Sequence, residues 1–311
     1  MSMLSSKPVE CPPSLLGRAK RGKAMTVAVA NPSTPLAMES VRDAHQHGLI
    51  EPVLVGSPGE ISSAADLLHW DISDLRIEPA SGEENIATVS ATLAANQDVS
   101  AIMKGDIHTD VLMRAVIHRD SGLRTEQLMS HVFQMTIPGS EQALFITDAV
   151  LNVFPTLEQK EQIAKNAVSL LLALGYEKPK LAILSATETA SSAMPSSEDA
   201  AELVQRARHG AIPNALVDGP MAFDLAVSLE ASKIKRFDSE VAGHADILLV
   251  PNIETGNALF KMMVYFMSAS AAGIVLGAKV PIILTSRADP TPARLASIAL
   301  ANIFANNQIR S

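Results

Sequence analysis

Cysteine is almost absent from this chain of 311 residues, and Cys11 is the single example. One cysteine cannot form an internal disulfide, which excludes the small disulfide-stapled class of secreted proteins. The opening stretch MSMLSSKPVECPPSLL also lacks the continuous apolar run and the small-residue cleavage site of a signal peptide. We therefore expect a cytoplasmic protein. Because Cys11 lies in a Pro-rich lead, we do not expect it to act as a nucleophile.

Positive charge is also scarce: 25 Lys and Arg residues face 33 Asp and Glu residues, and the formal net charge is −8. Sequence-independent nucleic-acid binding depends on a net cationic face, so this balance argues against nucleic acid as a partner. An anionic substrate would need local Arg side chains or backbone N–H groups. The 47% hydrophobic and 19% charged fractions are typical of a globular chain.

The familiar nucleotide and metal signatures are missing. Neither G-x-G-x-x-G after a strand nor G-x-x-x-x-G-K-[ST] occurs, which excludes Rossmann dehydrogenases and P-loop enzymes. His45 and His47 are two residues apart, a spacing that does not place them on one helix face. We expect no metal site. His108, just after the segment KGD, is the histidine best placed to line a cleft.

Only one apolar stretch is long enough to suggest a membrane span. Residues 262–278, MMVYFMSASAAGIVLGA, carry no charge and are at the lower limit of a span. Lys261 and Lys279 bound the stretch, and Ser268 and Ser270 interrupt it. We expect two closely packed buried elements here and no membrane partner.

Short, continuous apolar runs recur along the chain and end in Gly, Asp, Ser or Pro, as strands buried on both faces do in parallel sheets. They cover residues 24–30, 52–56, 100–106, 143–148, 180–186, 246–252 and 281–287. Helical patterns lie between them. Thr156 and Gln159 predict a capping box for a helix that ends near Gly175, and further helices are expected over 257–271 and from Thr291, with Pro292 in the first turn.

Alternating strands and helices predict an α/β fold with mostly parallel, doubly wound sheets, and the length suggests two domains or one large unit. Ligands bind such sheets beyond the carboxyl ends of the strands. Polar residues follow the predicted strands at Lys104-Gly105-Asp106, Thr147-Asp148, Ser185 with Thr187 and Glu188, Pro251-Asn252, and Thr285-Ser286-Arg287.

The segment 285–292, TSRADPTP, has the features of a phosphate site. An Arg at a strand end, followed by a helix start with free N–H groups, suits an anion, and Ser286 could add a hydroxyl donor. Asp289 would place a carboxylate beside that anion. The structural alternative is that Asp289 or Thr291 caps the last helix and that Arg287 pairs with Asp289.

From about residue 25 to the C-terminus, the chain resembles the phosphate acetyltransferase and phosphate butyryltransferase family, most closely its butyryltransferase branch. The segments that carry the resemblance are VPIILTSRAD, SAIMKGDIHTDVLMRAV, SHVFQMTIPG, ALFITDAVLNVFPTLEQK, LAILSATET, MPSSEDAAEL, VDGPMAFDLAVS and GHADILLVPNIETGNALFKMMVYF. The resemblance implies the reversible reaction of a short-chain acyl-CoA with phosphate to give acyl phosphate and CoA, by direct attack in a ternary complex. It implies no metal or organic cofactor, because CoA is itself a substrate.

The resemblance also implies two α/β domains of the isocitrate and isopropylmalate dehydrogenase type, with the active site in the cleft between them. We place the first domain at 1–147 with 290–311, including a loose N-terminal extension over 1–22. The second, at 148–289, would carry cleft residues and the interface of a homodimer.

By motif position, Ser286 and Arg287 match the family's phosphate-binding pair, and Arg114 matches a second active-site arginine. The family's proposed base is an aspartate six residues after Arg287, where this chain has Ala293. Asp289 is the nearest carboxylate and our candidate base. Lys104, Thr147, Asp148 and Asn252 are further candidates for substrate binding.

Two other interpretations stay open. Ala293 is compatible with a CoA- or acyl-phosphate-binding protein that has lost turnover. A metal- and NAD-dependent 3-hydroxy-acid dehydrogenase of related fold would need clustered aspartates, which we cannot assemble from the sequence.

Overall fold

The computed structural model describes residues 4–140, 142–285 and 289–308. It divides the chain into two compact units, which we call the central unit (Met1–Lys7 and Leu128–Ala271) and the terminal unit (Pro8–Gln127 and Ala272–Ser311). These boundaries differ from the predicted ones at 147/148 and 289/290. The difference arises from strand pairing. The chain contains two antiparallel hairpins that the sequence does not predict, and the observed boundaries lie near the start of each hairpin.

The central unit contains a five-stranded sheet in the order β5-β6-β9-β7-β8. Its strands are β5 (Ser130–Thr136), β6 (Ala143–Thr147), β7 (Lys180–Leu184), β8 (Leu216–Met221) and β9 (Ile247–Leu249). The β5 and β6 strands form an antiparallel hairpin, and the other neighbours are parallel. The helices are α6 (Leu157–Ala173), α7 (Pro195–Arg208), α8 (Phe223–Val227), α9 (Leu229–Lys235) and α10 (Ile253–Met267).

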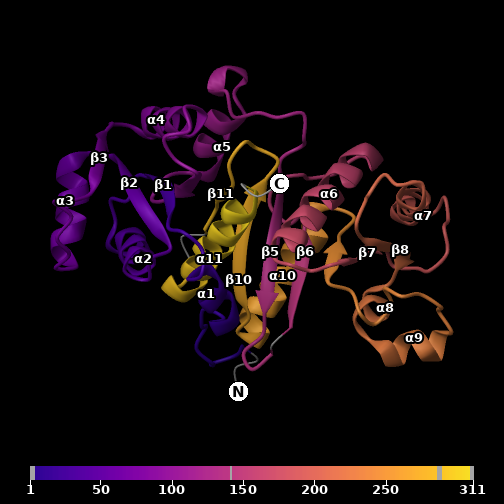
Figure 1. The fold of residues 1–311 in the computed structure, drawn as a ribbon. Coiled ribbons are helices and arrows are strands. Elements are labelled where there is room, and N and C mark those ends of the chain that lie inside the picture. Colours follow the sequence, from indigo (N-terminus) through magenta and orange to yellow (C-terminus); the bar gives the residue numbers. More distant parts are fainter. Residues whose placement is uncertain (1–3, 141, 286–288, 309–311) are drawn as a thin grey trace. The chain divides into compact units, whose positions relative to one another are not determined.

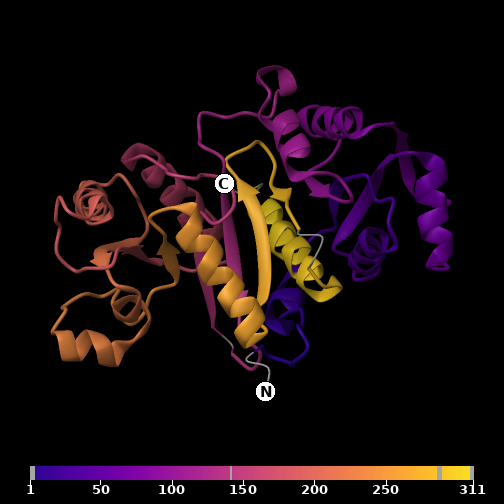
Figure 2. The ribbon, with the colours of Figure 1, turned by 180° about the vertical axis from the view of Figure 1, so that it is seen from behind.

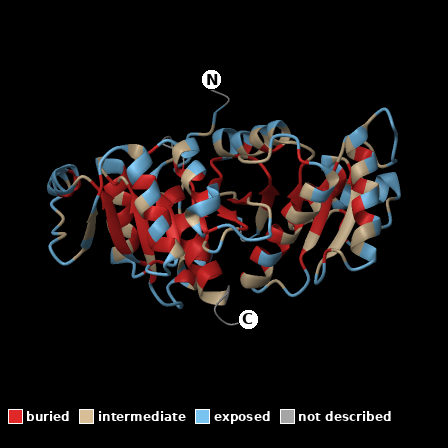
Figure 3. Cartoon of the chain, turned by 90° about the horizontal axis from the view of Figure 1, so that it is seen from above, coloured by how far each residue is buried: buried red, intermediate tan, exposed pale blue. Residues whose placement is uncertain are grey.

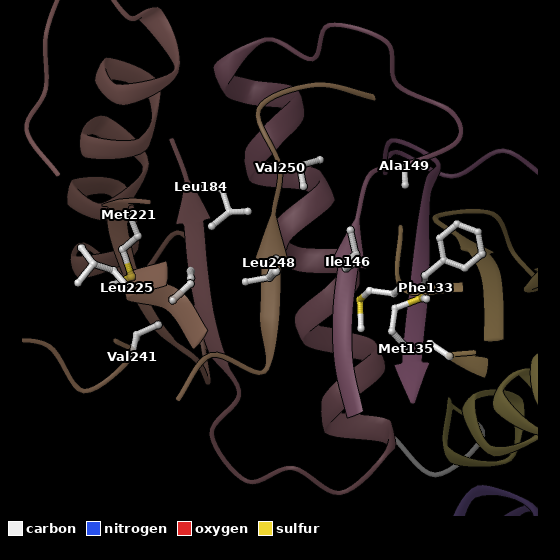
Figure 4. Packing of buried hydrophobic residues seen from close by; sticks show 14 of the residues in the cluster. Phe133, Met135, Ile146, Ala149, Leu184, Met221, Leu225, Val241, Leu248 and Val250 are labelled. Atoms are coloured by element: carbon white, nitrogen blue, oxygen red, sulfur yellow. The ribbon is translucent and has the colours of Figure 1, made fainter. Parts of the chain in front are cut away.

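Two helices cover opposite faces of this sheet. Helix α6 lies in front of the strands in Figure 1, and α10 comes to the front when the molecule is turned in Figure 2. The predicted capping box of α6 is present: Gln159 N–H donates to Thr156 Oγ1 at 3.3 Å, and Thr156 N–H donates to Gln159 Oε1 at 2.9 Å. Figure 4 shows the apolar layer on the sheet face that α10 covers. This layer runs from Phe133 through Ile146 and Leu248 to Leu184.

The terminal unit contains the strand order β3-β2-β1-β4-β11-β10. Its strands are β1 (Met25–Ala30), β2 (Ile50–Gly56), β3 (Arg76–Pro79), β4 (Ala101–Lys104), β11 (Ile282–Ile283) and β10 (Ser270–Leu276), of which 272–276 belong to this unit. All neighbours are parallel except β10 and β11. The helices are α1 (Pro13–Ala19), α2 (Pro35–Gln46), α3 (Pro58–Leu67), α4 (Glu83–Ala95), α5 (Thr109–Ile117) and α11 (Thr291–Gln308), with a 3₁₀ turn at Arg119–Ser121.

Two local expectations need correction. The predicted loose extension over 1–22 contains α1, which packs on α11 and buries Leu15 and Ala19. The run 262–278 does form two elements, which separate at Ser268 with φ of 51°. Its strand is buried throughout, whereas the last turns of α10 bury Met263 but expose other large apolar side chains. Among the described residues, we find no helix with the length and hydropathy needed to cross a bilayer.

Buried residues concentrate in the strands of each unit, and exposed residues lie on the outer sides of the helices and in the loops (Figure 3). An α/β fold with mostly parallel sheets is therefore confirmed. Parallel neighbours bring their carboxyl ends to the same edge of a sheet, and this directs attention to the residues that follow β1, β4 and β11 in the terminal unit and β6 and β9 in the central unit.

Candidate functional site

The carboxyl edge of the terminal unit gathers a set of polar residues, which we call the terminal cluster. They follow β1 (Asn31), β4 (Lys104 and Asp106) and β11 (Thr285 and Asp289), or lie in the first turn of α11 (Arg294).

Backbone contacts join two of the loops of the terminal cluster. Gly105 N–H donates to Ala30 O at 2.9 Å, Asp106 N–H to Asn31 O at 2.7 Å, and Asn31 Nδ2 to Asp106 O at 2.6 Å. A Cβ on Gly105 would lie 2.5 Å from the carbonyl oxygens of both Ala30 and Asn31, so only glycine fits. The loop after β4 is thereby fixed against the loop after β1.

Lys104 places a buried cation at this edge. Its side chain is almost fully buried, and its ammonium nitrogen lies 3.4 Å from Gly105 O and 3.5 Å from Thr285 O. A buried lysine is rare unless something compensates its charge. Thr285 Oγ1 and Asn31 Oδ1 are buried and have no hydrogen-bond partner among residues 4–140, 142–285 and 289–308. Within the part of the chain that the structure describes, the edge thus combines a buried cation with a hydroxyl and an amide oxygen that have no hydrogen-bond partner, as expected of a polar ligand site.

Arg294 is a second buried cation of the terminal cluster, and our sequence reasoning did not select it. Its exposure is 4%, and Nε donates to the backbone carbonyl of Asp289 at 3.1 Å. Burial lowers the pKa of the guanidinium, while the nearby carboxylates of Asp289 and Asp106 act in the opposite direction. A signal was available in the sequence, because Arg294 is the one charged residue between 291 and 308.

The two predicted phosphate-binding residues, Ser286 and Arg287, lie outside the described residues, between Thr285 and Asp289. Asp289 itself is half-buried and precedes α11. The first helical hydrogen bond runs from Arg294 N–H to Pro290 O at 3.2 Å, so Pro290 holds the cap position and Asp289 stands one residue before it. Thr291 Oγ1 donates to Glu39 of α2 at 2.9 Å. Neither residue occupies the cap position considered above.

Arg114 lies on the surface of α5, with a side chain that is 68% exposed and 3.3 Å from Asp110. It lines a cavity of about 460 Å³ between α4 and α5, together with Thr88, Thr92 and His118. The structure gives no contact between Arg114 and the described members of the terminal cluster. Its role in substrate binding therefore stays a prediction.

His108 precedes α5 and is exposed. Its Nδ1 lies 2.8 Å and 2.9 Å from the two carboxylate oxygens of Glu83, at the start of α4. The contact ties the segment after β4 to the segment after β3, which is a structural role.

The carboxyl edge of the central unit holds the predicted residues Thr147 and Asp148. Thr147 Oγ1 donates to His131 O at 2.8 Å. The buried Asp148 carboxylate accepts hydrogen bonds from the backbone N–H groups of His131, Val150 and Leu151 at 3.2, 2.8 and 3.0 Å, and from Asn152 Nδ2 at 2.6 Å. The Asp148 carboxylate therefore holds the surrounding backbone in place, and both of its oxygens already accept hydrogen bonds from within the central unit.

Asn252 serves as the N-cap of α10. Its Oδ1 accepts from Thr255 N–H at 3.0 Å and from Thr255 Oγ1 at 2.8 Å. A Cβ on Gly256 would lie 2.9 Å from Asp148 O, so the first turn of α10 packs tightly against the Asp148 loop. The structure brings Asn252 and Asp148 into one corner of the central unit, as the strand-end pattern predicts.

His131 lies beside this corner and was also missed. It is fully buried, and its ring packs edge-on against the ring of Phe133 with the two ring centroids 4.3 Å apart. Neither ring nitrogen has a hydrogen-bond partner among the described residues. Burial lowers its pKa from 6.5 to about 4, and the Asp148 charge only partly opposes this. His131 is therefore neutral at physiological pH. The alternation of apolar residues in SHVFQM gives no hint of this burial.

Groups suited to metal or thiol chemistry are not assembled in the part of the chain that the structure describes. No cluster of three His, Cys, Asp or Glu side chains suited to a metal occurs there. Burial raises the pKa of the Cys11 thiol to about 12, so it is not a ready nucleophile. Two other residues that follow predicted strands have partners on nearby elements. Ser185 Oγ lies 3.1 Å from Ser196 Oγ, and Lys235 Nζ lies 2.8 Å from Glu188 Oε1.

Comparisons with known proteins identify the family of this chain. Residues 82–302 match the family model described as "Phosphate acetyl/butaryl transferase". The chain is 44% identical over 294 residues to a phosphate acetyltransferase of Rickettsia felis, a match that covers 94% of this chain and 84% of that protein. It is 38% identical over 291 residues to the phosphate butyryltransferase of Clostridium acetobutylicum, covering 94% and 96% of the two chains.

Solved structures extend the comparison to the fold. A branched-chain phosphotransacylase from Enterococcus faecalis superposes with a TM-score of 0.78 and 30% identity, covering 90% of this chain and 99% of that one. A 4-hydroxythreonine-4-phosphate dehydrogenase from Klebsiella pneumoniae, at 13% identity and a TM-score of 0.56 over 91% and 100% of the chains, shares the fold alone. The chain belongs to the phosphate acetyltransferase and phosphate butyryltransferase family.

Proposed function

We propose that the protein catalyses the reversible reaction of a short-chain acyl-CoA with inorganic phosphate to give acyl phosphate and CoA. The observation that carries this proposal is the terminal cluster, where Lys104 and Arg294 are buried at the carboxyl edge of a parallel sheet and Lys104 Nζ lies 3.5 Å from Thr285 O. The buried Thr285 hydroxyl has no hydrogen-bond partner among the described residues. Cations and hydroxyl donors at such an edge suit a phosphate group. Family membership supports the same reaction.

In the direction that consumes acyl phosphate, the CoA sulfur attacks the acyl carbon. A new S–C bond forms, the C–O bond to phosphorus breaks, and its electron pair leaves with phosphate. The thiol proton must go to a base, since a thiol with a pKa near ~8.5 is mostly protonated at neutral pH. In our proposal, Asp289 accepts this proton, while Lys104, Ser286 and Arg287 hold the departing phosphate.

The central-unit residues contribute differently from the first expectation. Internal hydrogen bonds occupy the side-chain oxygens of Thr147, Asp148 and Asn252. We therefore assign them the role of supporting this edge, where exposed backbone groups would meet the substrate. Arg114, on the exposed surface of α5, is proposed to attract the anionic substrates.

A thiol-release assay tests the proposed function. Acetyl-CoA or butyryl-CoA is incubated with the protein, and free CoA is followed with a thiol reagent, with and without phosphate. The expected result is CoA release that requires phosphate. The alternative, a CoA-binding protein without turnover, predicts tight CoA binding and no release in either condition.

We further propose that two copies of the chain associate through α10. Met262, Tyr265, Phe266 and Met267 lie on its last turns and expose between 41% and 53% of their surface. Grouped exposed apolar side chains mark interaction surfaces, and a second copy of the chain can cover them in a symmetric dimer. Light scattering is expected to give about twice the chain mass of 32.9 kDa, and Tyr265→Lys with Phe266→Glu should give the single-chain mass. A parent protein at the single-chain mass would contradict the dimer.

A further inference from the structure

A groove between α4 and α5 of the terminal unit has no role in the proposed function beyond its residue Arg114. The cavity has a volume of about 460 Å³, which lies within the usual range of small-molecule sites. Both helices begin at the carboxyl edge of the sheet, because α4 follows β3 and α5 follows β4 (Figure 1). The groove thus starts at the edge where ligands bind an α/β sheet.

The edge end of the groove lies near the terminal cluster. Glu84 and Val111, in the first turns of α4 and α5, line the groove at this end. His108 Nδ1 lies 2.8 Å from a carboxylate oxygen of Glu83, so the starts of the two helices are joined. Asp106 of the terminal cluster precedes His108 by two residues. A ligand that leaves the terminal cluster on this side therefore meets the groove.

The α4 side and the floor of the groove suit an apolar chain that carries N–H groups. The floor includes the buried Ala91 and the half-buried Ala115, whose small side chains leave room for a ligand. Thr88 Oγ1 donates to Glu84 O and Thr92 Oγ1 to Thr88 O, each at 2.8 Å. Since these bonds use the hydroxyl hydrogens, the two oxygens can only accept hydrogen bonds from a ligand. They lie about 6 Å apart along the helix axis and form a row of acceptors.

The α5 side of the groove offers hydrogen-bond donors instead. Arg114 Nη2 lies 3.3 Å from Asp110, but both side chains are largely exposed. Such a solvated pair contributes little to stability, so Arg114 can exchange Asp110 for an anionic ligand at low cost. His118 Nδ1 accepts from Asp120 N–H at 3.2 Å, which leaves the hydrogen of the neutral ring on Nε2. Asp120 carries an opposing charge, which water screens because its side chain is 88% exposed. This side therefore suits phosphate and carbonyl oxygens.

We propose that the groove binds the pantetheine arm of CoA and places the phosphates of CoA beside Arg114 and His118. The inference rests on the proposed function, in which the CoA sulfur reacts at the terminal cluster. The arm is a chain of methylene and amide groups that continues from the sulfur to the phosphates. Its methylene groups match the alanine floor, its N–H groups match the oxygens of Thr88 and Thr92, and the phosphates match the guanidinium of Arg114.

The test compares acyl-CoA with the N-acetylcysteamine thioester of the same acyl group, which lacks most of the arm and all of the phosphates. Ala115→Leu fills the groove with a larger side chain. It is expected to raise the KM for acyl-CoA about tenfold, and to lower the ratio of kcat/KM for acyl-CoA to kcat/KM for the short thioester by the same factor. Asn85→Leu is the matched control: this exposed α4 residue does not line the groove, and the ratio should stay at the parental value.

Calorimetric binding of CoA is an independent measurement that does not need turnover, and it also serves if Ala115→Leu does not fold. Arg114→Met, at an exposed side chain, is expected to weaken CoA binding about tenfold, because the phosphates lose a charge-assisted hydrogen bond. Arg119→Met is the matched control: it removes the same charge from an exposed residue that does not line the groove, and CoA affinity should stay near the parental value.

Parental CoA affinity in Arg114→Met, or a parental ratio in a folded Ala115→Leu protein, would overturn the inference. A loss of CoA affinity that is equal in Arg114→Met and Arg119→Met would overturn it as well, since any surface cation would then have the same effect. A parent protein that binds CoA but shows no phosphate-dependent release would instead overturn the proposed function and leave the groove proposal standing.

Discussion

Asp289→Asn is expected to lower kcat by roughly 10² to 10⁴, because the amide keeps the size and hydrogen bonding of the carboxylate but cannot accept the thiol proton. Raising the pH should partly restore the rate, since more free CoA thiolate then forms without a base. The KM for acyl phosphate should change less than kcat. The measurement is kcat and KM for CoA and acyl phosphate across a range of pH.

A matched control for Asp289→Asn is Asp66→Asn, at an exposed carboxylate on α3 that should tolerate the change. The structural alternative, a helix cap, predicts the reverse pattern: Asn would be a good substitute, and Asp289→Ala would cost about 1 kcal/mol of stability. The position of Asp289 one residue before the cap disfavours that alternative. An Asn variant with parental kcat would leave the base unidentified.

The second large effect is on stability and comes from His131. Its pKa in the folded state is about 4, whereas an unfolded histidine titrates near 6.5. Above pH 6.5 the residue is neutral in both states and adds no pH dependence. As the pH falls from 6.5 to 4, the unfolded state takes up a proton that the folded state does not, so stability is lost. The full pKa shift corresponds to a loss of roughly 3 kcal/mol in the free energy of unfolding.

His131→Phe removes this titration while keeping a ring against Phe133. Because neither ring nitrogen is hydrogen-bonded among the described residues, the change leaves no such partner stranded. Denaturant unfolding of both proteins between pH 7 and 4 is expected to show the parent losing stability relative to His131→Phe. A difference that stays constant with pH would mean that folding does not shift the pKa of His131, and would contradict the prediction.

Local chemistry was the most predictable part of this protein. The Thr156 capping box, the start of α11 at Thr291 and most of the strands follow from hydrogen-bonding and periodicity rules that act within a few residues. Strand β5 escaped prediction because SHVFQMT mixes polar residues into a strand that is buried on both faces. The two antiparallel hairpins could not be predicted either, because strand order is set by packing rather than by local sequence.

The candidate site was predictable in its parts but not in its contacts. Lys104 and Asp289 could be selected because they follow apolar runs that end at a sheet edge. Lys104 could not be joined to Thr285 from spacing alone, because their contact depends on β11 lying beside β4. Asp148 and Asn252 were selected because they follow strands, and only the structure shows that their side-chain oxygens form internal hydrogen bonds.

Direct detection of acyl phosphate is the measurement closest to the central claim, that the terminal cluster delivers phosphate to the acyl carbon. Acyl-CoA, phosphate and the protein are combined, and the products are followed by ³¹P NMR with a parallel count of free CoA. The account predicts acyl phosphate and CoA in equal amounts. CoA accompanied by free carboxylic acid, with no acyl phosphate signal, would show that water rather than phosphate is the acceptor and would contradict it.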